Sequence, residues 1–148
     1  MLGKGDKSVE LYKMITPIEH ARTKEAANKY KVEPYVLAAD VYGAQNLAGS
    51  GGWTWYTGSS SWYYLAGVQY ILGLNIYHNT ISFNPCIPKF WERFEIKYKF
   101  GNSIYNIVVK NPDGKNTGIS KVLIDEIEHE NKINLDGSGK VFNVEIIM

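Results

Sequence analysis

The stretch WYYLAGVQYILGLNIYHNTISFN, residues 62–84, decides the fold class. Its first half is an apolar segment of helical length, and Gly73 is a typical residue at the C-terminal end of a helix. After Asn75 the residues are β-branched or alternate in polarity, which indicates strands. The chain is therefore expected to change from helices to strands near residues 77–80. The apolar run Trp62–Ile76 has 15 residues, fewer than the roughly 20 that cross a bilayer, so no membrane span is expected.

Upstream of this stretch the sequence favours helices. Residues 7–15 predict a helix that ends at Thr16-Pro17. Thr23 can cap a second helix, and Pro34 can begin a third over residues 35–42. The apolar helix that ends near Leu72 is expected to be capped by Ser59, Ser60 or Ser61 after a loop over residues 43–58.

Downstream of it the sequence favours strands. Five segments, TISFN, FEIKYKF, SIYNIVVKN, ISKVLIDEI and KVFNVEIIM, alternate or are β-branched. Pro112-Asp113-Gly114 and Asp136-Gly137 are turn signals between them. Helices followed by an antiparallel β unit define an α+β chain, and we expect a helical domain over residues 1–78 and a β domain over residues 79–148.

Composition excludes several classes of protein. Hydrophobic residues make up 45% and charged residues 21% of the 148 residues, too apolar a balance for a disordered chain. A net charge of +1 gives no reason to expect a nucleic-acid partner. One cysteine, Cys86, excludes an internal disulfide framework and is expected to be a buried thiol rather than a nucleophile. With no signal peptide in the first residues, a cytoplasmic location is expected.

The candidate site lies in a long segment without charge. Between Asp40 and Lys89 there are 48 positions without Lys, Arg, Asp or Glu, and the motif GGWTWYTGSSSW, residues 51–62, lies within it. Tryptophan faces can stack on a sugar ring. Thr57-Gly58-Ser59 precedes a predicted helix, where backbone N–H groups favour an anion such as phosphate. The alternative is a glycine-rich loop whose tryptophans only pack against the helices.

Other candidate residues have weaker support. Glu33 and Asp40, seven residues apart, would share a helix face and could act as an acid–base pair, but Pro34 interrupts that helix. His20 could contact a ligand or be a hydrogen-bonded loop histidine. No pair of histidines has metal-ligand spacing, so neither a metal site nor a cofactor is expected.

Four long motifs together resemble glycoside hydrolase family 94. They are TPIEHART, YKVEPYVLAADVY, GGWTWYTGSSSW and FNPCIPKFWERFEIKYKFGNSIYNIVVKNP, and they span nearly the whole chain. The family contains cellobiose and chitobiose phosphorylases and the phosphorylase-like part of cyclic β-1,2-glucan synthases. The tail from Ile119 onward looks more like the β-1,2-glucan members. The resemblance is to the C-terminal end of these enzymes and implies the last helices of an (α/α)6 barrel, followed by a small antiparallel β domain.

The resemblance also implies a reaction and its site. Inorganic phosphate is the co-substrate and attacks the anomeric carbon of a β-glucoside with inversion. Thr57 and Gly58 match the motif that helps to hold phosphate. The residues expected at the sugar are Glu33, Trp53, Trp55 and Tyr56.

The departures from the family limit these expectations. The general-acid aspartate and the rest of the phosphate clamp match nothing in this chain and are expected upstream; neither His20 nor Arg22 occupies their motif. The chain by itself is therefore expected to be inactive and to need the remainder of the barrel. Without it, Tyr63, Tyr64, Tyr70 and Ile71 are expected to form an exposed apolar patch that favours self-association. The alternatives are a stand-alone carbohydrate-binding module and a structural fragment without catalysis; sugar, linkage and oligomeric state stay open.

Overall fold

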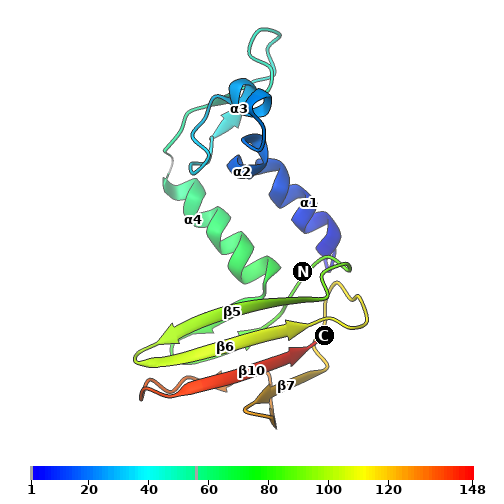
Figure 1. The fold of residues 1–148 in the computed structure, drawn as a ribbon, viewed down its shortest axis with the longest axis vertical. Helices are drawn as coiled ribbons and strands as arrows, with labels where there is room; N and C mark the ends of the chain where they lie inside the picture. Colours follow the sequence, from blue (N-terminus) through cyan, green and yellow to red (C-terminus); the bar gives the residue numbers. More distant parts are fainter. Residues whose placement is uncertain (1, 56) are drawn as a thin grey trace. The chain divides into compact units, whose positions relative to one another are not determined.

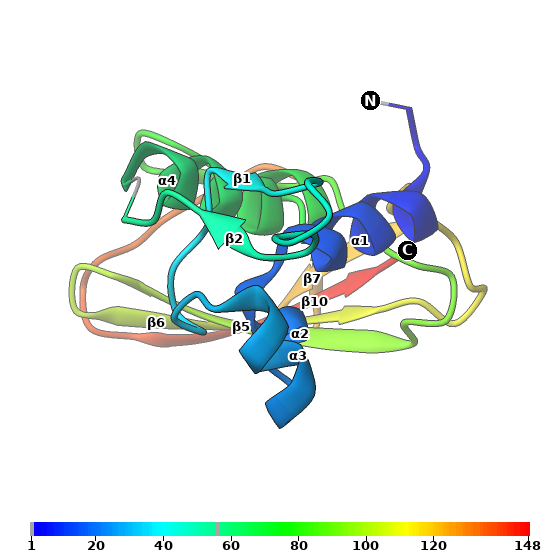
Figure 2. The ribbon, with the colours of Figure 1, turned by 90° about the horizontal axis from the view of Figure 1, so that it is seen from above.

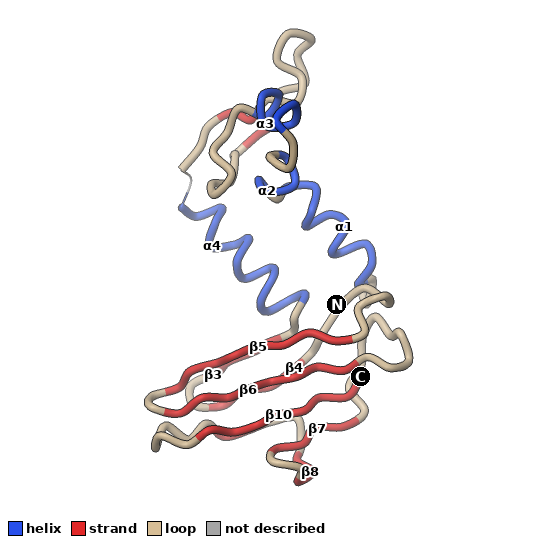
Figure 3. The backbone as a smooth tube through the Cα atoms, viewed as in Figure 1, coloured by secondary structure: helices blue, strands red, loops and turns tan. Residues whose placement is uncertain are grey.

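The computed structural model describes residues 2–55 and 57–148, with Thr57 described by its backbone alone. The chain divides into two compact units. We call Glu10–Gly67 the helical unit, and Met1–Val9 with Val68–Met148 the β unit. The α-helices precede the larger sheets along the chain, so the α+β class is confirmed (Figure 3). The division into domains at residues 78 and 79 stays a prediction.

Most of the predicted helices are present. Their bounds, with the short strands between them, are α1 Gly5–Ile15, α2 Pro17–His20, α3 Lys24–Tyr30, β1 Asp40–Val41, β2 Gly51–Gly52 and α4 Thr57–Leu65. Thr23 caps α3 as predicted, because its side-chain oxygen accepts a hydrogen bond from the backbone N–H of Ala26 at 3.1 Å. Pro17 begins α2 directly after α1, where a missing N–H costs nothing.

The helix predicted over residues 35–42 is wrong. Pro34 instead occupies the second position of a β-turn in which the backbone N–H of Val36 donates to the carbonyl of Glu33 at 3.2 Å. A proline φ near −65° suits this turn position as well as a helix start, so the residue alone does not distinguish them. The following backbone pairs with residues 50–53, and β1 and β2 form an antiparallel ladder (Figure 2).

The apolar helix begins earlier than predicted and ends close to the predicted position. It begins at Thr57, so Ser59–Ser61 lie within it and do not cap it. After Leu65 it continues as a π-helix, η1 Ala66–Ile71, and Gly73 follows with φ +75°. The predicted glycine at its C-terminal end is confirmed.

The apolar patch expected on this helix is only half present. Tyr64 and Tyr70 are exposed, as expected. Ile71 is buried at 6% exposure, and Tyr63 is half-buried because its ring stacks on that of Tyr12 from α1.

The described residues of the β unit form two sheets, and Figure 1 shows the larger of them. A three-stranded sheet has the order β3-β4-β9, and a five-stranded sheet has the order β5-β6-β10-β7-β8. The strands are β3 Leu74–Tyr77, β4 Thr80–Phe83, β5 Arg93–Phe100, β6 Ser103–Lys110, β7 Lys121–Ile124, β8 Ile127–His129, β9 Ile133–Asn134 and β10 Val141–Ile147. All five predicted segments contribute strands, and the segment ISKVLIDEI contributes both β7 and the start of β8, with a turn at Asp125-Glu126.

The prediction of a purely antiparallel β unit is wrong at one pair. The last strand, β10, lies between β6 and β7, and it runs parallel to β6 with Val144 beside Ile107. It is antiparallel to β7, and β5 is antiparallel to β6. The β7–β8 hairpin pairs with the edge of β10 that faces away from β6, so β10 and not β7 is the neighbour of β6.

Alternation along the strands explains the core of the β unit. In β6, Tyr105, Ile107 and Val109 are buried, while the residues between them face outward and are half-exposed. In β10, Val144 and Ile146 are buried on the same side. Cys86 is also buried, at 3% exposure, which confirms the expected burial of its thiol. In the part of the chain that the structure describes, no helix is long and apolar enough to span a membrane.

Candidate functional site

Glu33 lies in a tight turn that directly follows α3. The helix ends at Lys31, which adopts φ 55° and donates its backbone N–H to the carbonyl of Ala27 at 2.8 Å. The turn at Glu33–Val36 begins two residues later and leaves the Glu33 side chain half-buried. The sequence KVEPY therefore fixes the backbone that carries the candidate carboxylate.

Tyr30 anchors this turn to the glycine-rich loop. It is buried at 3% exposure, and its ring stacks on that of His20 with centroids 4.5 Å apart. Burial raises the pKa of the Tyr30 phenol. A Cβ on Gly51 would come within 3.3 Å of the Tyr30 ring and 2.3 Å of a Val32 methyl, so only glycine fits at this point of the loop.

The short β1–β2 ladder brings the tryptophans to the same region. Asp40 pairs with Gly52, and the backbone N–H of Ala39 donates to the carbonyl of Trp53 at 2.9 Å. Trp53 and Trp55 follow with φ 34° and 65°, left-handed values that bulky residues seldom adopt. Their side chains are 69% and 63% exposed. Strained, exposed aromatic residues in a supported loop are typical of a binding site.

One contact joins two of the predicted sugar residues. The indole Nε1–H of Trp55 donates to the Oε1 of Glu33 at 3.3 Å. The ring of Tyr35 meets the Trp55 indole edge-on, with centroids 6.0 Å apart and planes at 66°. The helical unit thus places a carboxylate and two aromatic rings together, a combination that suits the hydroxyl groups and apolar face of a sugar.

The predicted phosphate residues lie where α4 begins. Thr57 is the first residue of α4, and Gly58 is exposed in its first turn. The first backbone N–H groups of a helix have no partner within it and carry the positive end of its dipole. An added Cβ on Gly58 would meet nothing within 4 Å, so the backbone here is open to a ligand. Tyr56 and the side chain of Thr57 lie outside the described residues.

The structure decides between the alternatives for two other candidates, the Glu33–Asp40 pair and His20. Glu33 and Asp40 do not share a helix, because α3 ends before Glu33 and Asp40 lies in β1, so the acid–base pair on one helix face is wrong. His20 lies at the end of α2, and its Nε2 is 2.8 Å from the carbonyl oxygen of Met14. The hydrogen-bonded alternative for His20 is therefore the correct one. Arg22 forms an ion pair with Glu19 at 2.6 Å.

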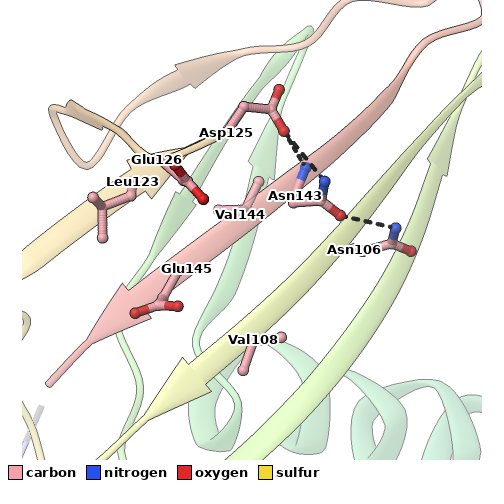
Figure 4. Close-up of a pocket in the computed structure, with 8 residues that line it drawn as sticks. All are labelled: Asn106, Val108, Leu123, Asp125, Glu126, Asn143, Val144 and Glu145. Atoms are coloured by element: carbon pink, nitrogen blue, oxygen red, sulfur yellow. Dashed lines mark hydrogen bonds between the residues drawn. The ribbon is translucent and has the colours of Figure 1, made fainter.

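A hollow in the β unit was not predicted from the sequence. It has a volume of about 610 Å³ (Figure 4). Its lining residues are Asn106, Val108, Leu123, Asp125, Glu126, Asn143, Val144 and Glu145. Alternation along the strands indicates which residues of one strand share a face. It does not indicate that β10 lies beside β6, and that pairing is what brings these residues together.

The polar groups of this hollow bind mainly one another. Asn143 donates its backbone N–H to Asp125 at 3.0 Å, and Asn106 donates to Asn143 at 3.4 Å. Glu145 forms an ion pair with Lys110 at 2.6 Å. Among the described residues, no group of three or more His, Cys, Asp or Glu side chains could hold a metal ion.

Comparison with known proteins identifies the family to which the chain belongs. Residues 1–73 match the model of the glycosyl hydrolase 94 superfamily, catalytic domain. The chain belongs to glycoside hydrolase family 94, a family of glycoside phosphorylases and glucan synthases, and the resemblance stated from the motifs is confirmed.

Three relatives show how far the similarity extends. The cyclic beta-(1,2)-glucan synthase NdvB of Rhizobium meliloti (strain 1021) is 39% identical over 106 residues, 72% of this chain and 4% of that protein. N,N'-diacetylchitobiose phosphorylase of Vibrio furnissii is 30% identical over 99% of this chain and 18% of that protein. Solabiose phosphorylase of Paenibacillus borealis is 28% identical over 99% of this chain and 19% of that protein. The chain thus spans less than a fifth of the length of these relatives.

Proposed function

We propose that this chain is the C-terminal part of an inverting glycoside phosphorylase that acts on β-glucosides with inorganic phosphate. In this proposal residues 1–78 complete an (α/α)6 barrel and residues 79–148 form its β domain. The chain supplies part of the phosphate and sugar sites, and the general acid comes from the rest of the barrel. A cytoplasmic location belongs to the proposal, since the lone thiol of Cys86 stays reduced there.

The observation that carries the proposal is the hydrogen bond between Trp55 and Glu33. These residues are 22 positions apart, and both come from motifs that resemble the sugar site of the family. A carboxylate accepts hydrogen bonds from sugar hydroxyls, and an aromatic ring covers the apolar face of a pyranose. The start of α4 at Thr57 and Gly58 supports phosphate binding, because unpaired N–H groups and the helix dipole favour an anion.

Exposed apolar side chains on α1 and α4 support the proposal that further helices of a barrel pack against this chain. On α1, Leu11, Met14 and Ile15 are each more than half exposed, and on α4 Trp62 and Tyr64 are as well. Helices of a self-contained domain bury such residues against a neighbour. We propose that further helices of the barrel cover them.

The reaction follows from these parts. A phosphate oxygen attacks the anomeric carbon, the glycosidic C–O bond breaks, and the leaving oxygen takes a proton from the general acid. Phosphate replaces the water of a hydrolase. The product from a β-glucoside is therefore an α-sugar 1-phosphate and a free sugar.

The test uses the longest gene product that contains this chain. We expect it to release α-glucose 1-phosphate from a β-linked glucose disaccharide only when phosphate is present, as read by phosphorus NMR. Thr57→Ala is expected to raise the KM for phosphate, and Glu33→Gln the KM for the sugar. Hydrolysis that needs no phosphate, or a β-sugar phosphate product, would contradict the proposal.

A second candidate, a carbohydrate-binding module, is favoured by the exposure of Trp53 and Trp55. It predicts that a β-glucan quenches tryptophan fluorescence of this chain with the same affinity with and without phosphate. Dependence of that affinity on phosphate favours the phosphorylase instead.

A further inference from the structure

The Trp55 indole makes a directed contact with Glu33. An indole has one N–H and accepts no hydrogen bond, so its bond to Oε1 of Glu33 at 3.3 Å uses its whole polar capacity. An ionised carboxylate has room for about four hydrogen bonds, and the indole occupies one of them. The Oε2 of Glu33 is left to other donors.

The backbone of the tryptophan loop holds the indole in this direction. Trp53 and Trp55 keep φ values of 34° and 65°, which are unfavourable for bulky residues. Strained conformations persist where neighbours restrain them. Here the restraints are the β1–β2 ladder and the hydrogen bond from Ala39 to the Trp53 carbonyl, both directly before Trp55.

The turn that carries Glu33 also contacts the ring of Trp55. Tyr35 lies two residues after Glu33 and meets the indole edge-on at 6.0 Å between centroids. The indole is thus fixed by one polar and one aromatic contact from the same four-residue turn. In return, the carboxylate of Glu33 is restrained by a ring that a second loop presents to it.

We infer that Trp55 is the positioning residue for the Glu33 carboxylate, and that the held carboxylate presents Oε2 to a hydroxyl group of a neutral pyranose. This inference rests on the proposed function for the choice of ligand, whereas the positioning is a property of the chain itself. A glutamate side chain loses considerable rotamer freedom when a ligand immobilises it. A carboxylate that the indole already restrains loses less of that freedom, which strengthens sugar binding.

The first experiment reads the contact directly in the full chain. The indole ¹⁵N–¹H resonance of Trp55 is assigned through Trp55→Phe and compared between wild type, Glu33→Ala and Glu33→Gln. We expect Glu33→Ala to move the Trp55 indole proton upfield, as loss of a hydrogen bond does, and Glu33→Gln to keep most of the shift because it retains an acceptor oxygen. The indole of Trp62, exposed on α4, is the internal control and stays in place.

The second experiment reads the consequence for the ligand. Calorimetry with a β-1,2-linked glucose disaccharide is expected to show about tenfold weaker binding for Trp55→Phe, which keeps the ring and removes the N–H. Trp62→Phe is the matched control and is expected to bind as wild type does. The circular dichroism spectrum of Trp55→Phe is expected to match that of wild type, so that its weaker binding is not a result of unfolding.

The two readouts separate the inference from the proposed function. If Glu33→Ala does not move the indole N–H resonance of Trp55, the positioning role is overturned, regardless of the result with the disaccharide. Equal disaccharide affinity for wild type and Trp55→Phe also overturns it while leaving sugar binding in place. If no disaccharide binds the wild-type chain and the indole signal responds to Glu33, the positioning stands and the sugar function of the isolated chain fails.

Discussion

The rings of Tyr12 and Tyr63 lie face to face, with centroids 3.9 Å apart and planes within 12° of parallel. Tyr12 belongs to α1 and Tyr63 to α4, so the stack joins the first and last helices of the helical unit. The hydroxyl of Tyr63 donates to the backbone carbonyl of Tyr12 at 3.1 Å and also contacts the hydroxyl of Thr16. These contacts hold the first turns of α4 against α1.

The Tyr12–Tyr63 stack predicts a loss of stability at alkaline pH. Burial, with hydrogen bonding to Tyr63, raises the pKa of the Tyr12 phenol from 10.0 to about 12. Because the folded state holds this proton more tightly than the unfolded chain, the stabilisation is complete below pH 10 and is lost as the pH rises from 10 to about 12. Urea unfolding at several pH values through that window measures the loss.

Tyr12→Phe is the control for this pH dependence. It keeps the ring but has no proton to lose, so its stability is expected to fall less steeply over the same window. A carbon-13 NMR titration of Tyr12 is expected to give a midpoint of about 12 in wild type and one closer to 10 in Tyr63→Phe. Equal alkaline loss in wild type and Tyr12→Phe would contradict the assignment.

Gly51 is predicted to tolerate no side chain. A Cβ there would lie 2.3 Å from a Val32 methyl and 3.2 Å from the Cβ of Ala38, so Gly51→Ala is expected to destabilise the chain by about 1–3 kcal/mol. Gly43→Ala is the matched control, because a Cβ on Gly43 meets nothing within 4 Å, and a change within about 0.5 kcal/mol is expected. Urea unfolding measures both.

A double variant tests whether the Val32 methyl is the cause. Gly51→Ala with Val32→Ala removes the clashing methyl, and it is expected to be less destabilised than the sum of the two single variants. Additive effects would show that the loop needs glycine for another reason.

Asn111 is predicted to be the polar residue on which the β unit depends most. It is buried at 2% exposure, and its side chain donates to the carbonyls of Trp91 at 3.2 Å and Lys115 at 2.9 Å. It also accepts from the backbone N–H of Lys115 at 2.8 Å. Asn111→Ala leaves these part-buried backbone groups without their side-chain partner, and a loss of about 2–4 kcal/mol in the free energy of unfolding is expected.

Asn106→Ala is the comparison for Asn111. Asn106 is half-exposed, and the hydrogen bond that its side chain donates to Asn143 is long at 3.4 Å. Its replacement is expected to change stability by less than about 1 kcal/mol. Similar losses for the two variants would mean that burial does not set the cost.

The sequence predicted elements where local signals agree with the tertiary structure. The Thr23 cap and the alternation in residues 103–110 are examples, because a cap and a half-buried strand depend on nearby residues. Residues 35–42 were predicted wrongly because Pro34 suits both a helix start and a turn, and only pairing with Gly51-Gly52 decides between them. The parallel neighbours β6 and β10 were missed because periodicity does not say which strand lies beside which.

The candidate site was predicted as a set of residues but not as an arrangement. Motif resemblance named Glu33 and Trp55, and chemistry suggested a phosphate site at Thr57-Gly58-Ser59, directly before the predicted helix. The contact between Glu33 and Trp55 depends on a turn and on two left-handed residues, and no helix or strand period encodes these. Tyr35 was missed for the same reason, since it is significant only through the turn that brings its ring to Trp55.

Alanine substitutions at Gly73 and Gly118 are expected to separate the cost of backbone strain from the cost of a steric clash. Gly73 and Gly118 both have positive φ, +75° and +97°, so alanine is strained at either position. Only at Gly73 would the new Cβ also meet other atoms, 2.2 Å from the carbonyl carbon of Asn84 and 2.3 Å from the nitrogen of Pro85. Backbone atoms cannot move aside as a flexible side chain does. Gly118→Ala is therefore expected to cost about 1 kcal/mol, and Gly73→Ala at least about 3 kcal/mol, as measured by urea unfolding. Equal losses at the two positions would mean that the close approach of residues 84–85 to Gly73 does not exist in solution, and that the end of η1 is fixed by φ alone.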